Sequence, residues 1–487
     1  MQETHQPAYL AGRCKIFMKT VRTRIAPSPT GEDIHIGNLY TALINFAVAK
    51  KHDGEFIIRI EDTDRTRFQE GAEAKILRSV NAYGLRYDEG PDIGGKFAPY
   101  RQSERLPLYK KYAEELISKG TAYYCFCTKD RLDGLRNEQQ LAKKTPRYDK
   151  YCLHHVSNAA ERIASGESYV IRLNVVPGKK MSFNDVIRGE IIFNSDEVDD
   201  QVLMKSDGYP TYHLGVVIDD HLMEISHVIR AEEWISSTPK HVLLYESFGW
   251  ELPLFAHLPI LRNPDKSKLS KRKNAVWASW YLSEGYLREA VINYLSLMSW
   301  SHPEGKELFS LDEFIQLFSL DTVHTTGPVF DIQKLEWMNG VYIREVLTEK
   351  ELLERLSDFY KDDQDILNVL QDGDVTRRSR LLELTKTRMK TLKDFQFFLK
   401  NPVQEDRYEN EQIELAKYLY EKLTALHDAS WEEAGILREL KLFCAEKQVS
   451  MRIAYVLLTG NPQGLPLPQF MEYLGKEKTL ERLRRYF

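Results

Sequence analysis

The stretch Ile25-Ala26-Pro27-Ser28-Pro29-Thr30-Gly31-Glu32-Asp33-Ile34-His35-Ile36-Gly37-Asn38 separates a predicted strand from a predicted helix. Residues 21–26 alternate β-branched and polar side chains, which predicts a short strand. Apolar residues then recur at helical spacing between 39 and 47. A strand–loop–helix unit directs backbone N–H groups and the positive end of the helix at the loop, which favours phosphate binding. We predict a nucleotide site in which His35 donates to a phosphate oxygen and Gly37 lets an adenine or ribose approach the backbone.

The alternative for this stretch alone is a proline-rich turn that caps an ordinary helix, with His35 a surface histidine. The longer string Ala-Pro-Ser-Pro-Thr-Gly, followed by His-Ile-Gly, resembles the first signature of the class I aminoacyl-tRNA synthetases in its glutamyl form. The class-wide signature has histidine at the fourth position of the tetrapeptide, where this chain has Asn38. That departure bears only on the role of this side chain.

The chain has 487 residues, of which 43% are hydrophobic and 29% charged. This length predicts about three to five domains, and no apolar run approaches the roughly 20 residues that span a bilayer. The net charge of −5 argues against indiscriminate nucleic-acid binding. Five cysteines form an odd, sparse set that fits a reducing cytoplasm. We therefore expect a cytoplasmic protein of several domains, without a membrane partner.

The apolar segment 55–60 is typical of a strand in a parallel sheet, and Glu61-Asp62-Thr63-Asp64-Arg65 follows it. Ligands of such sheets bind beyond the carboxyl ends of the strands, so Glu61 is placed to meet a cationic group such as a substrate α-ammonium. The alternative is that these acids cap the next predicted helix, at 70–83. The string Arg-Ile-Glu-Asp-Thr-Asp resembles the glutamyl and glutaminyl synthetases.

Two cysteines separated by one residue follow an amphipathic helix predicted at 106–119, and a third thiol lies downstream. Such thiols bind tetrahedral zinc in many proteins, although buried free cysteines are a common alternative. The set resembles the zinc-binding knuckle of some glutamyl synthetases, including an unusual tyrosine ligand. The resemblance implies a structural zinc held by Cys125, Cys127, Tyr148 and Cys152.

Short strands are predicted at 169–174 and 191–194, and again at 216–219 and 226–230. The alternation of strands and helices stops after the first βαβ unit and resumes only with the segments at 216–219 and 226–230. We interpret residues 101–215 as an insertion between the two halves of one sheet. In the resembling family this insertion holds the acceptor end of tRNA.

A second family string, Arg-Ala-Glu-Glu-Trp, begins at Arg230. A guanidinium binds a carboxylate with two parallel hydrogen bonds, which an ammonium cannot match. A surface salt bridge is the alternative for any single arginine, and core packing is the alternative for Tyr212. The resemblance implies a glutamate pocket made by Arg24, Ala26, Ser28, Glu61, Tyr212 and Arg230. Some relatives carry asparagine near Val216, and we do not assign that contact here.

The sequence Lys268-Leu269-Ser270-Lys271-Arg272 places two lysines around a serine on a proline-started loop. A cationic loop of this kind stabilises the charge that develops on phosphate oxygens during nucleotidyl transfer. Alone it would be read as a basic surface loop, but it resembles the second class I signature and follows the first. Together the two imply ATP binding, with Mg²⁺, by His35, Gly37, Asn38, Leu261, Lys268, Ser270 and Lys271. Catalytic roles are predicted for His35, Lys268 and Lys271.

Amphipathic helical segments dominate from about residue 287 to the end. Glutaminyl synthetases carry β-barrels at this place, and a shorter relative that modifies a tRNA base lacks such a tail. The helical tail therefore favours the glutamyl branch. Arg388 and Arg452 are candidates for reading anticodon bases, because arginine reaches the edges of unstacked bases well.

The fold class predicted is α/β: a Rossmann-like nucleotide-binding domain with an inserted α+β acceptor-binding domain, followed by an all-α half. The predicted boundaries are an N-terminal extension at 1–19 (a disordered arm, or a segment before a start at Met18), catalytic halves at 20–100 and 216–262, the insertion at 101–215, a stem-contact domain at 263–347 and an anticodon-binding domain at 348–487.

The activity implied is ATP-dependent activation of L-glutamate and its transfer to the tRNA for glutamate, by a monomer. Charging of the tRNA for glutamine is left open. An adenylyltransferase for another acid would explain both signatures but not the helical tail. A non-catalytic RNA-binding relative would explain the tail but needs neither signature.

Overall fold

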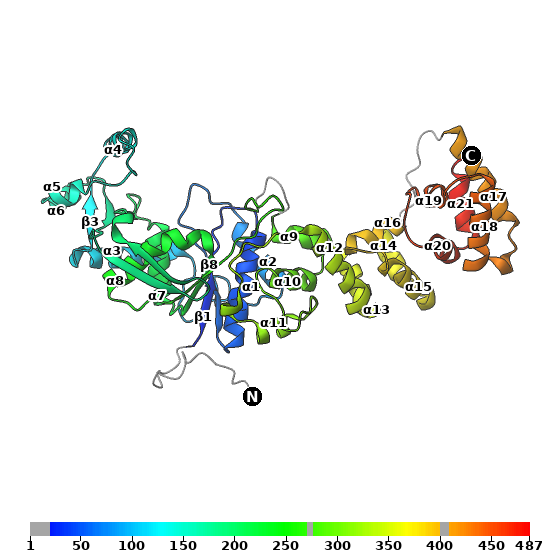
Figure 1. Cartoon of the computed structure of the whole chain (residues 1–487), viewed down its shortest axis with the longest axis horizontal. Coiled ribbons are helices and arrows are strands. Elements are labelled where there is room, and N and C mark those ends of the chain that lie inside the picture. The colour runs from blue at the N-terminus through cyan, green and yellow to red at the C-terminus, as the bar shows by residue number, and fades with distance from the viewer. Residues whose placement is uncertain (1–19, 270–275, 400–408) are drawn as a thin grey trace, which may run out of the picture. The chain divides into compact units, whose positions relative to one another are not determined.

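The computed structural model describes residues 20–269, 276–399 and 409–487 (Figure 1). The predicted extension at 1–19 and the predicted ATP contacts Ser270 and Lys271 lie outside these residues. The chain forms two compact units. The first holds the chain up to Ser279 together with Leu295–Phe330, and the second holds Trp280–Tyr294 together with Asp331–Phe487.

The first unit is built on parallel strands that alternate with helices, as predicted. Its first elements are β1 (Arg22–Ile25), α1 (Ile36–Lys51), β2 (Glu55–Ile58) and α2 (Ala72–Ala82). Its later elements are α7 (Tyr212–Leu222), β8 (His227–Ala231), α8 (Thr238–Phe248) and β9 (Leu254–Leu258). Strand β1 pairs in parallel with β2, and β8 pairs in parallel with β9. The Ser226 N–H donates to the Arg22 carbonyl at 3.0 Å, so β1 also lies beside β8 (Figure 1).

Helix α1 begins where the proline-rich loop ends, and residues along most of its length are buried. The side chain of His35 caps its first turn by accepting from the Gly37 N–H. Before the helix, the loop packs against Trp277: a Cβ on Gly31 would lie 2.7 Å from the indole ring. Glycine at this position therefore allows the backbone of the loop to pack directly against the indole ring.

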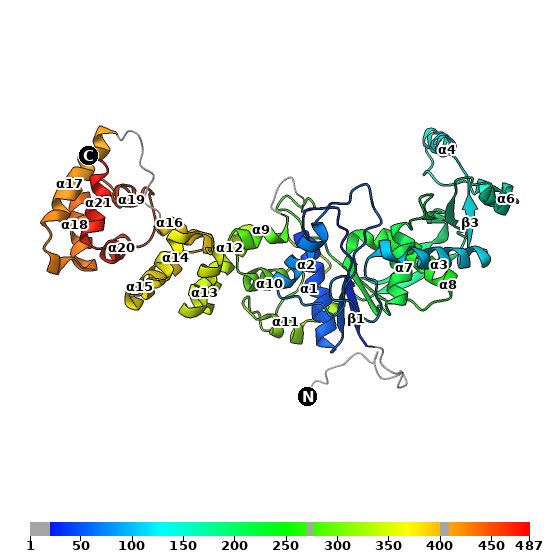
Figure 2. The same ribbon diagram turned by 180° about the vertical axis from the view of Figure 1, so that it is seen from behind.

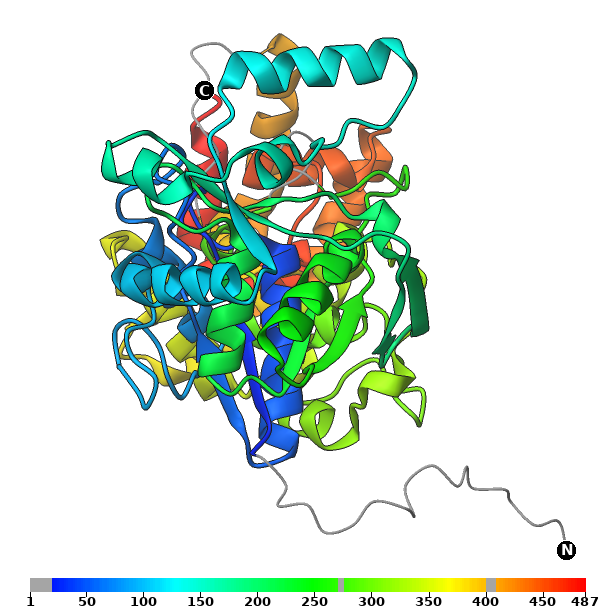
Figure 3. The ribbon, with the colours of Figure 1, turned by 90° about the vertical axis from the view of Figure 1, so that its left-hand side faces the viewer.

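The predicted insertion contains two sets of strands. Its elements are α3 (Leu106–Ser118), β3 (Ala122–Cys125), α4 (Lys129–Leu141), α5 (Tyr151–His155), α6 (Ala159–Ala164), β4 (Val170–Leu173), β5 (Lys180–Asp185), β6 (Gly189–Asn194) and β7 (Val202–Met204). Strands β3, β4 and β7 form an antiparallel sheet of their own. Helix α4 has no fully buried residue, and Leu132 and Leu135 on it pack against the cluster of Cys125, Tyr148 and Cys152 (Figure 3).

The hairpin β5–β6 instead belongs to the sheet that contains β8 and β9. Asp185 on β5 pairs in parallel with Phe255 on β9, and the Val186 N–H donates to the Phe255 carbonyl at 2.8 Å. The sheet order is therefore β6-β5-β9-β8.

The predicted strand at 216–219 is wrong, because these residues lie inside helix α7. Consecutive residues from Leu214 to Asp220 are buried, so the segment lacks the polar face by which an amphipathic helix is recognised. Helix α7 packs against both α3 and α8, which are near it in the opposite views of Figures 1 and 2.

Helices follow β9 in the described part of the chain, as predicted. They are α9 (Ala278–Ser283), α10 (Arg288–Ser296), α11 (Leu311–Leu317), α12 (Ile332–Val341), α13 (Glu349–Phe359), α14 (Gln364–Leu370), α15 (Val375–Lys386), α16 (Phe395–Leu399), α17 (Asn410–Ala425), α18 (Glu433–Glu446), α19 (Met451–Thr459), α20 (Leu467–Leu474) and α21 (Lys476–Arg484). The last five helices share one hydrophobic core that includes Leu419, Leu440 and Leu483. No described helix is both long and apolar enough to cross a membrane.

Candidate active site

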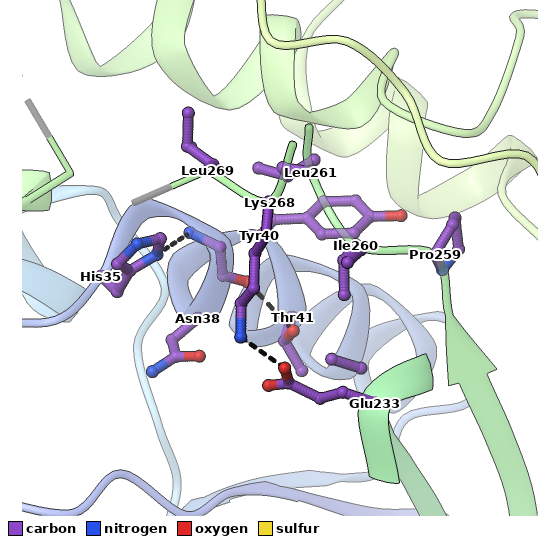
Figure 4. A pocket seen from close by; sticks show the side chains of 12 residues that line it. His35, Asn38, Tyr40, Thr41, Glu233, Pro259, Ile260, Leu261, Lys268 and Leu269 are labelled. Carbon is purple, nitrogen blue, oxygen red and sulfur yellow. Dashed lines mark hydrogen bonds and ion pairs between the residues drawn. The ribbon is translucent and has the colours of Figure 1, made fainter. Parts of the chain in front are cut away.

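A cavity of about 360 Å³ lies between the start of α1, the end of β8 and the segment after β9 (Figure 4). This volume is within the range of small-molecule sites. Its walls carry most of the predicted ATP contacts and two further residues of the second family string: His35, Gly37, Asn38, Leu261, Lys268, Ala231 and Glu233. The structure thus brings residues from both signature stretches to one cavity.

His35 has a defined hydrogen-bonding role at the helix start. Its Nδ1 accepts from the Gly37 N–H at 3.0 Å, so a neutral ring carries its proton on Nε2. That proton is a donor of the kind predicted for a phosphate oxygen. A Cβ on Gly37 would lie 3.2 Å from the same Nδ1, which explains the small residue beside the ring.

Lys268 reaches the cavity from a tight hairpin. The Asn263 N–H donates to the Ser267 carbonyl at 2.8 Å, and the Leu269 N–H donates to the Leu261 carbonyl at 3.1 Å. The Lys268 ammonium contacts the Glu233 carboxylate within the cavity (Figure 4). The hairpin therefore holds a cation at the wall of the site.

A cluster of buried charges adjoins the carboxyl ends of β1 and β2. Asp220 accepts two hydrogen bonds from Arg24, both at 3.0 Å, and one from Arg59 at 2.8 Å. Arg59 also donates to Glu61 at 3.1 Å. Each carboxylate of this cluster thus has an arginine partner, and Arg24 already has a carboxylate partner of its own.

The loops that follow these strands run side by side. The Glu61 N–H donates to the Pro27 carbonyl at 3.1 Å, which places Ala26 and Ser28 next to Glu61. Burial raises the pKa of Glu61 to about 7, against the opposing effect of Arg59 and Arg24.

Arg230 differs from the other buried arginines here because no carboxylate pairs with it among the described residues. It lies on β8, and the residue is only 6% exposed. The guanidinium donates to His257 Nε2 at 3.2 Å, Tyr212 Oη at 3.2 Å, His241 Nδ1 at 3.3 Å and Thr238 Oγ1 at 2.8 Å. All four acceptors are uncharged, and the nearby Asp220 acts on the guanidinium only through space.

A guanidinium has five N–H groups. Nε uses its single one on His257, Nη1 uses both of its own on Tyr212 and His241, and Nη2 uses one on Thr238. One Nη2 N–H has no acceptor within the described part of the chain. Tyr212 accepts from Arg230, so the hydroxyl proton of Tyr212 is directed away from the guanidinium. Charge and donors together fit a carboxylate ligand.

Comparison with known proteins agrees with the predicted resemblance to the class I synthetases. Residues 20–337 match the family model described as tRNA synthetases class I (E and Q), catalytic domain, and residues 351–487 match an anticodon binding domain. The chain is 47% identical over 481 residues to a glutamate–tRNA ligase of Thermus thermophilus, covering 96% of this chain and 99% of that protein. The chain belongs to the glutamate–tRNA ligase family.

Two further proteins are similar to this chain over nearly the same extent. A glutamate–tRNA ligase of Cellvibrio japonicus is 43% identical over 484 residues, covering 96% of this chain and 93% of that protein. The crystal structure of a glutamate tRNA ligase from Elizabethkingia meningosepticum in complex with its amino acid superposes with a TM-score of 0.79 at 33% identity, covering 96% of this chain and 99% of that one. The predicted fold class, including the helical C-terminal half, is confirmed.

The four predicted metal ligands lie close together in the structure. The sulfur atoms of Cys125, Cys127 and Cys152 lie within 4.8 Å of one another. The Tyr148 hydroxyl lies 3.4 Å from the Cys125 sulfur and 3.2 Å from the Cys127 sulfur. Three thiols and a phenol that converge in this way fit a tetrahedral zinc site, and the Arg172 guanidinium over the Tyr148 ring would offset the negative charge of the ligands.

The two tail arginines are exposed, as contact with RNA requires, but no interaction joins them among the described residues. Arg388 follows α15, and Arg452 lies in the first turn of α19. Sequence reasoning missed a cavity of about 230 Å³ in the same unit, which is lined by Phe397, Thr459, Leu465 and Arg482 among others.

Sequence reasoning also missed the acids and histidines around the predicted glutamate and ATP contacts. Asp220 is the partner of Arg24, and Glu233 is the partner of Lys268. His241 and His257 both contact Arg230. A signal for Asp220 was present in the sequence, because two adjacent acids within a buried apolar run need cationic partners.

Proposed function

We propose that this enzyme activates L-glutamate with ATP and transfers the glutamyl group to tRNA, with glutamate bound at Arg230 and ATP in the adjoining cavity. The observation that supports this most directly is the buried Arg230 guanidinium, whose charge and remaining N–H have no protein partner among the described residues. A carboxylate of glutamate would accept that N–H and the Tyr212 hydroxyl proton. Glu61 would bind the α-ammonium, and the backbone at Ala26 and Ser28 would line the same pocket.

Arg24 would act in this pocket through its positive charge, because two of its N–H groups already donate to Asp220. Together Arg24 and Arg230 make the pocket cationic, and Glu61 makes one side of it anionic. This polarity matches an amino acid with a second carboxylate.

MgATP is the second substrate, and its phosphates would lie at the start of α1. His35 would donate from Nε2, while Lys268 and the neighbouring Ser270 and Lys271 would meet the negative charge of the triphosphate. Gly37, Asn38 and Leu261 would line the site of the nucleoside. Lys268 would leave Glu233 as the phosphates arrive.

The reaction needs no protein nucleophile. An oxygen of the glutamate α-carboxylate attacks the α-phosphorus of ATP, the bond to the β-phosphate breaks, and pyrophosphate leaves. A hydroxyl of the terminal ribose of tRNA then attacks the carbonyl carbon of glutamyl-adenylate and releases AMP. By family resemblance the 2′-hydroxyl is acylated first, and tRNA binds before activation. The protein supplies alignment and charge stabilisation.

The remaining assignments follow the same family pattern. Cys125, Cys127, Tyr148 and Cys152 would hold a structural zinc ion, which would fix the fold of this part of the inserted segment. That segment, residues 101–215, would bind the acceptor end of tRNA, the domain at 263–347 the stem, and Arg388 and Arg452 the anticodon. The enzyme would act as a cytoplasmic monomer.

The test is charging of purified tRNA with radiolabelled glutamate. Charging of the tRNA for glutamate alone indicates a discriminating enzyme, and charging of the tRNA for glutamine as well indicates a non-discriminating one. Failure to charge either tRNA, by a folded protein, would contradict the proposal.

A further inference from the structure

Arg230 lies at the centre of a chain of buried hydrogen bonds that reaches beyond the substrate pocket. On one side its Nε contacts His257 Nε2, and His257 Nδ1 contacts Asp185 Oδ2 at 2.6 Å. On the other side its Nη1 contacts His241 Nδ1, and His241 Nε2 lies 3.1 Å from His213 Nδ1. His257 is 0% exposed and Asp185 is 1% exposed.

These contacts determine where the ring protons are. A guanidinium has no acceptor, so each imidazole nitrogen that faces Arg230 must be unprotonated. His257 therefore carries its proton on Nδ1, where it donates to Asp185. By the same argument His241 carries its proton on Nε2 and donates to His213. Burial, with the charge of Arg230, lowers the pKa of both His241 and His257, which agrees with neutral rings.

The two carboxylate oxygens of Asp185 have different hydrogen-bond partners. Its Oδ1 accepts from the N–H groups of Ile187 and Arg188, both at 3.0 Å. Its Oδ2 is the oxygen that faces His257. The carboxylate therefore has no freedom to exchange its two oxygens without losing two backbone hydrogen bonds.

We propose that Asp185 and His257 are positioning residues for the amino-acid substrate: Asp185 fixes the tautomer of His257, and His257 then orients Arg230. This inference rests on the proposed role of Arg230 in binding glutamate. With the other tautomer, the Nε2–H of His257 would turn to Thr238 Oγ1, which lies 3.1 Å away, and would face the Nε N–H of Arg230 instead of accepting from it. The guanidinium would turn away, and its remaining donor would no longer point at the substrate carboxylate.

The test is Asp185→Asn, in which the side chain keeps its size. The two backbone N–H groups require the amide oxygen at the Oδ1 place, so the NH₂ group faces His257 and forces its proton onto Nε2. The KM for glutamate should then rise by about 10- to 100-fold, the cost of losing one hydrogen bond to a charged group. The KM for ATP should change by less than about twofold, because the ATP cavity does not include these residues.

The matched control is Asp53→Asn, which makes the same chemical change at an exposed acid between α1 and β2 and should leave both constants unchanged. Arg230→Met is measured in parallel. If Arg230→Met raises the KM for glutamate and Asp185→Asn does not, the positioning role is overturned while the proposed function stands. If neither variant raises it, the proposed function itself fails.

A measurement on the unaltered enzyme keeps the inference testable should Asp185→Asn fail to fold. Selective ¹⁵N labelling of histidine distinguishes protonated from unprotonated ring nitrogens, and the His257 signals are assigned by their loss in His257→Gln. A His257 ring that is protonated at Nδ1 and unprotonated at Nε2 supports the inference. A proton on Nε2 overturns it.

Discussion

Replacing Arg230 by methionine should remove glutamate recognition while sparing ATP. The methionine side chain fills much of the same space without charge or donors. In the proposed complex Arg230 and the substrate carboxylate form a buried ion pair, since the arginine is 6% exposed before glutamate binds. Loss of one partner of a buried pair costs about 3–5 kcal/mol. At about 1.4 kcal/mol for each factor of ten, kcat/KM for glutamate should fall by about 140- to 4,000-fold.

The assay is steady-state charging of tRNA at varied glutamate and then at varied ATP. Thermal unfolding is followed alongside, because the substitution leaves the acceptors His257 Nε2 and Thr238 Oγ1 without their donor. Arg78→Met is the control, since Arg78 is exposed on α2. A fall below tenfold, or an equal fall in kcat/KM for ATP, in a folded Arg230→Met protein would refute the reasoning.

Three further predictions use other parts of the first unit. Because burial raises the pKa of Glu61 to about 7, and only its ionised form attracts an α-ammonium, kcat/KM for glutamate should rise with pH up to about 7 and level off above it. A Glu61→Gln variant should show no such rise, and an unchanged profile would exclude this residue. Metal analysis should find one zinc per chain that is lost in Cys152→Ser and kept in Cys444→Ser; loss in neither, or zinc in no variant, contradicts the site. Gly31→Ala should destabilise by about 1–3 kcal/mol because its Cβ overlaps an indole ring, whereas Gly134→Ala, on an open face of α4, should stabilise by up to about 1 kcal/mol in chemical denaturation.

The sequence predicted the elements whose pattern is local. The strand, loop and helix around His35 were predictable because turn residues and apolar spacing are visible within one short window. The helix at Val216 was not, since burial on every side removes the alternation of apolar and polar residues that distinguishes a helix from a strand. The spacing of the cysteines already indicated a metal site, whereas Tyr148 as a fourth ligand was predictable only through the family pattern, because a lone tyrosine carries no metal-binding signal.

The electrostatic partners could not have been read from the sequence. Arg24 and Asp220 are far apart along the chain, and so are Arg230 and His257. Which arginine has a carboxylate partner depends on tertiary packing alone. In the proposed pocket this distinction separates the two arginines: Arg24 already pairs with Asp220, whereas no carboxylate pairs with Arg230 among the described residues.

The pairing of β5 with β9 has a consequence for protein engineering. Exchange of the inserted segment between related synthetases would be a natural way to alter tRNA preference. Such a chimera would also replace β5, and a foreign strand that paired poorly with β9 would leave backbone groups of β9 exposed at a sheet edge, where strands of other chains can add. A transplant that keeps the β5–β6 hairpin of the recipient and exchanges only the segments around it should remain soluble.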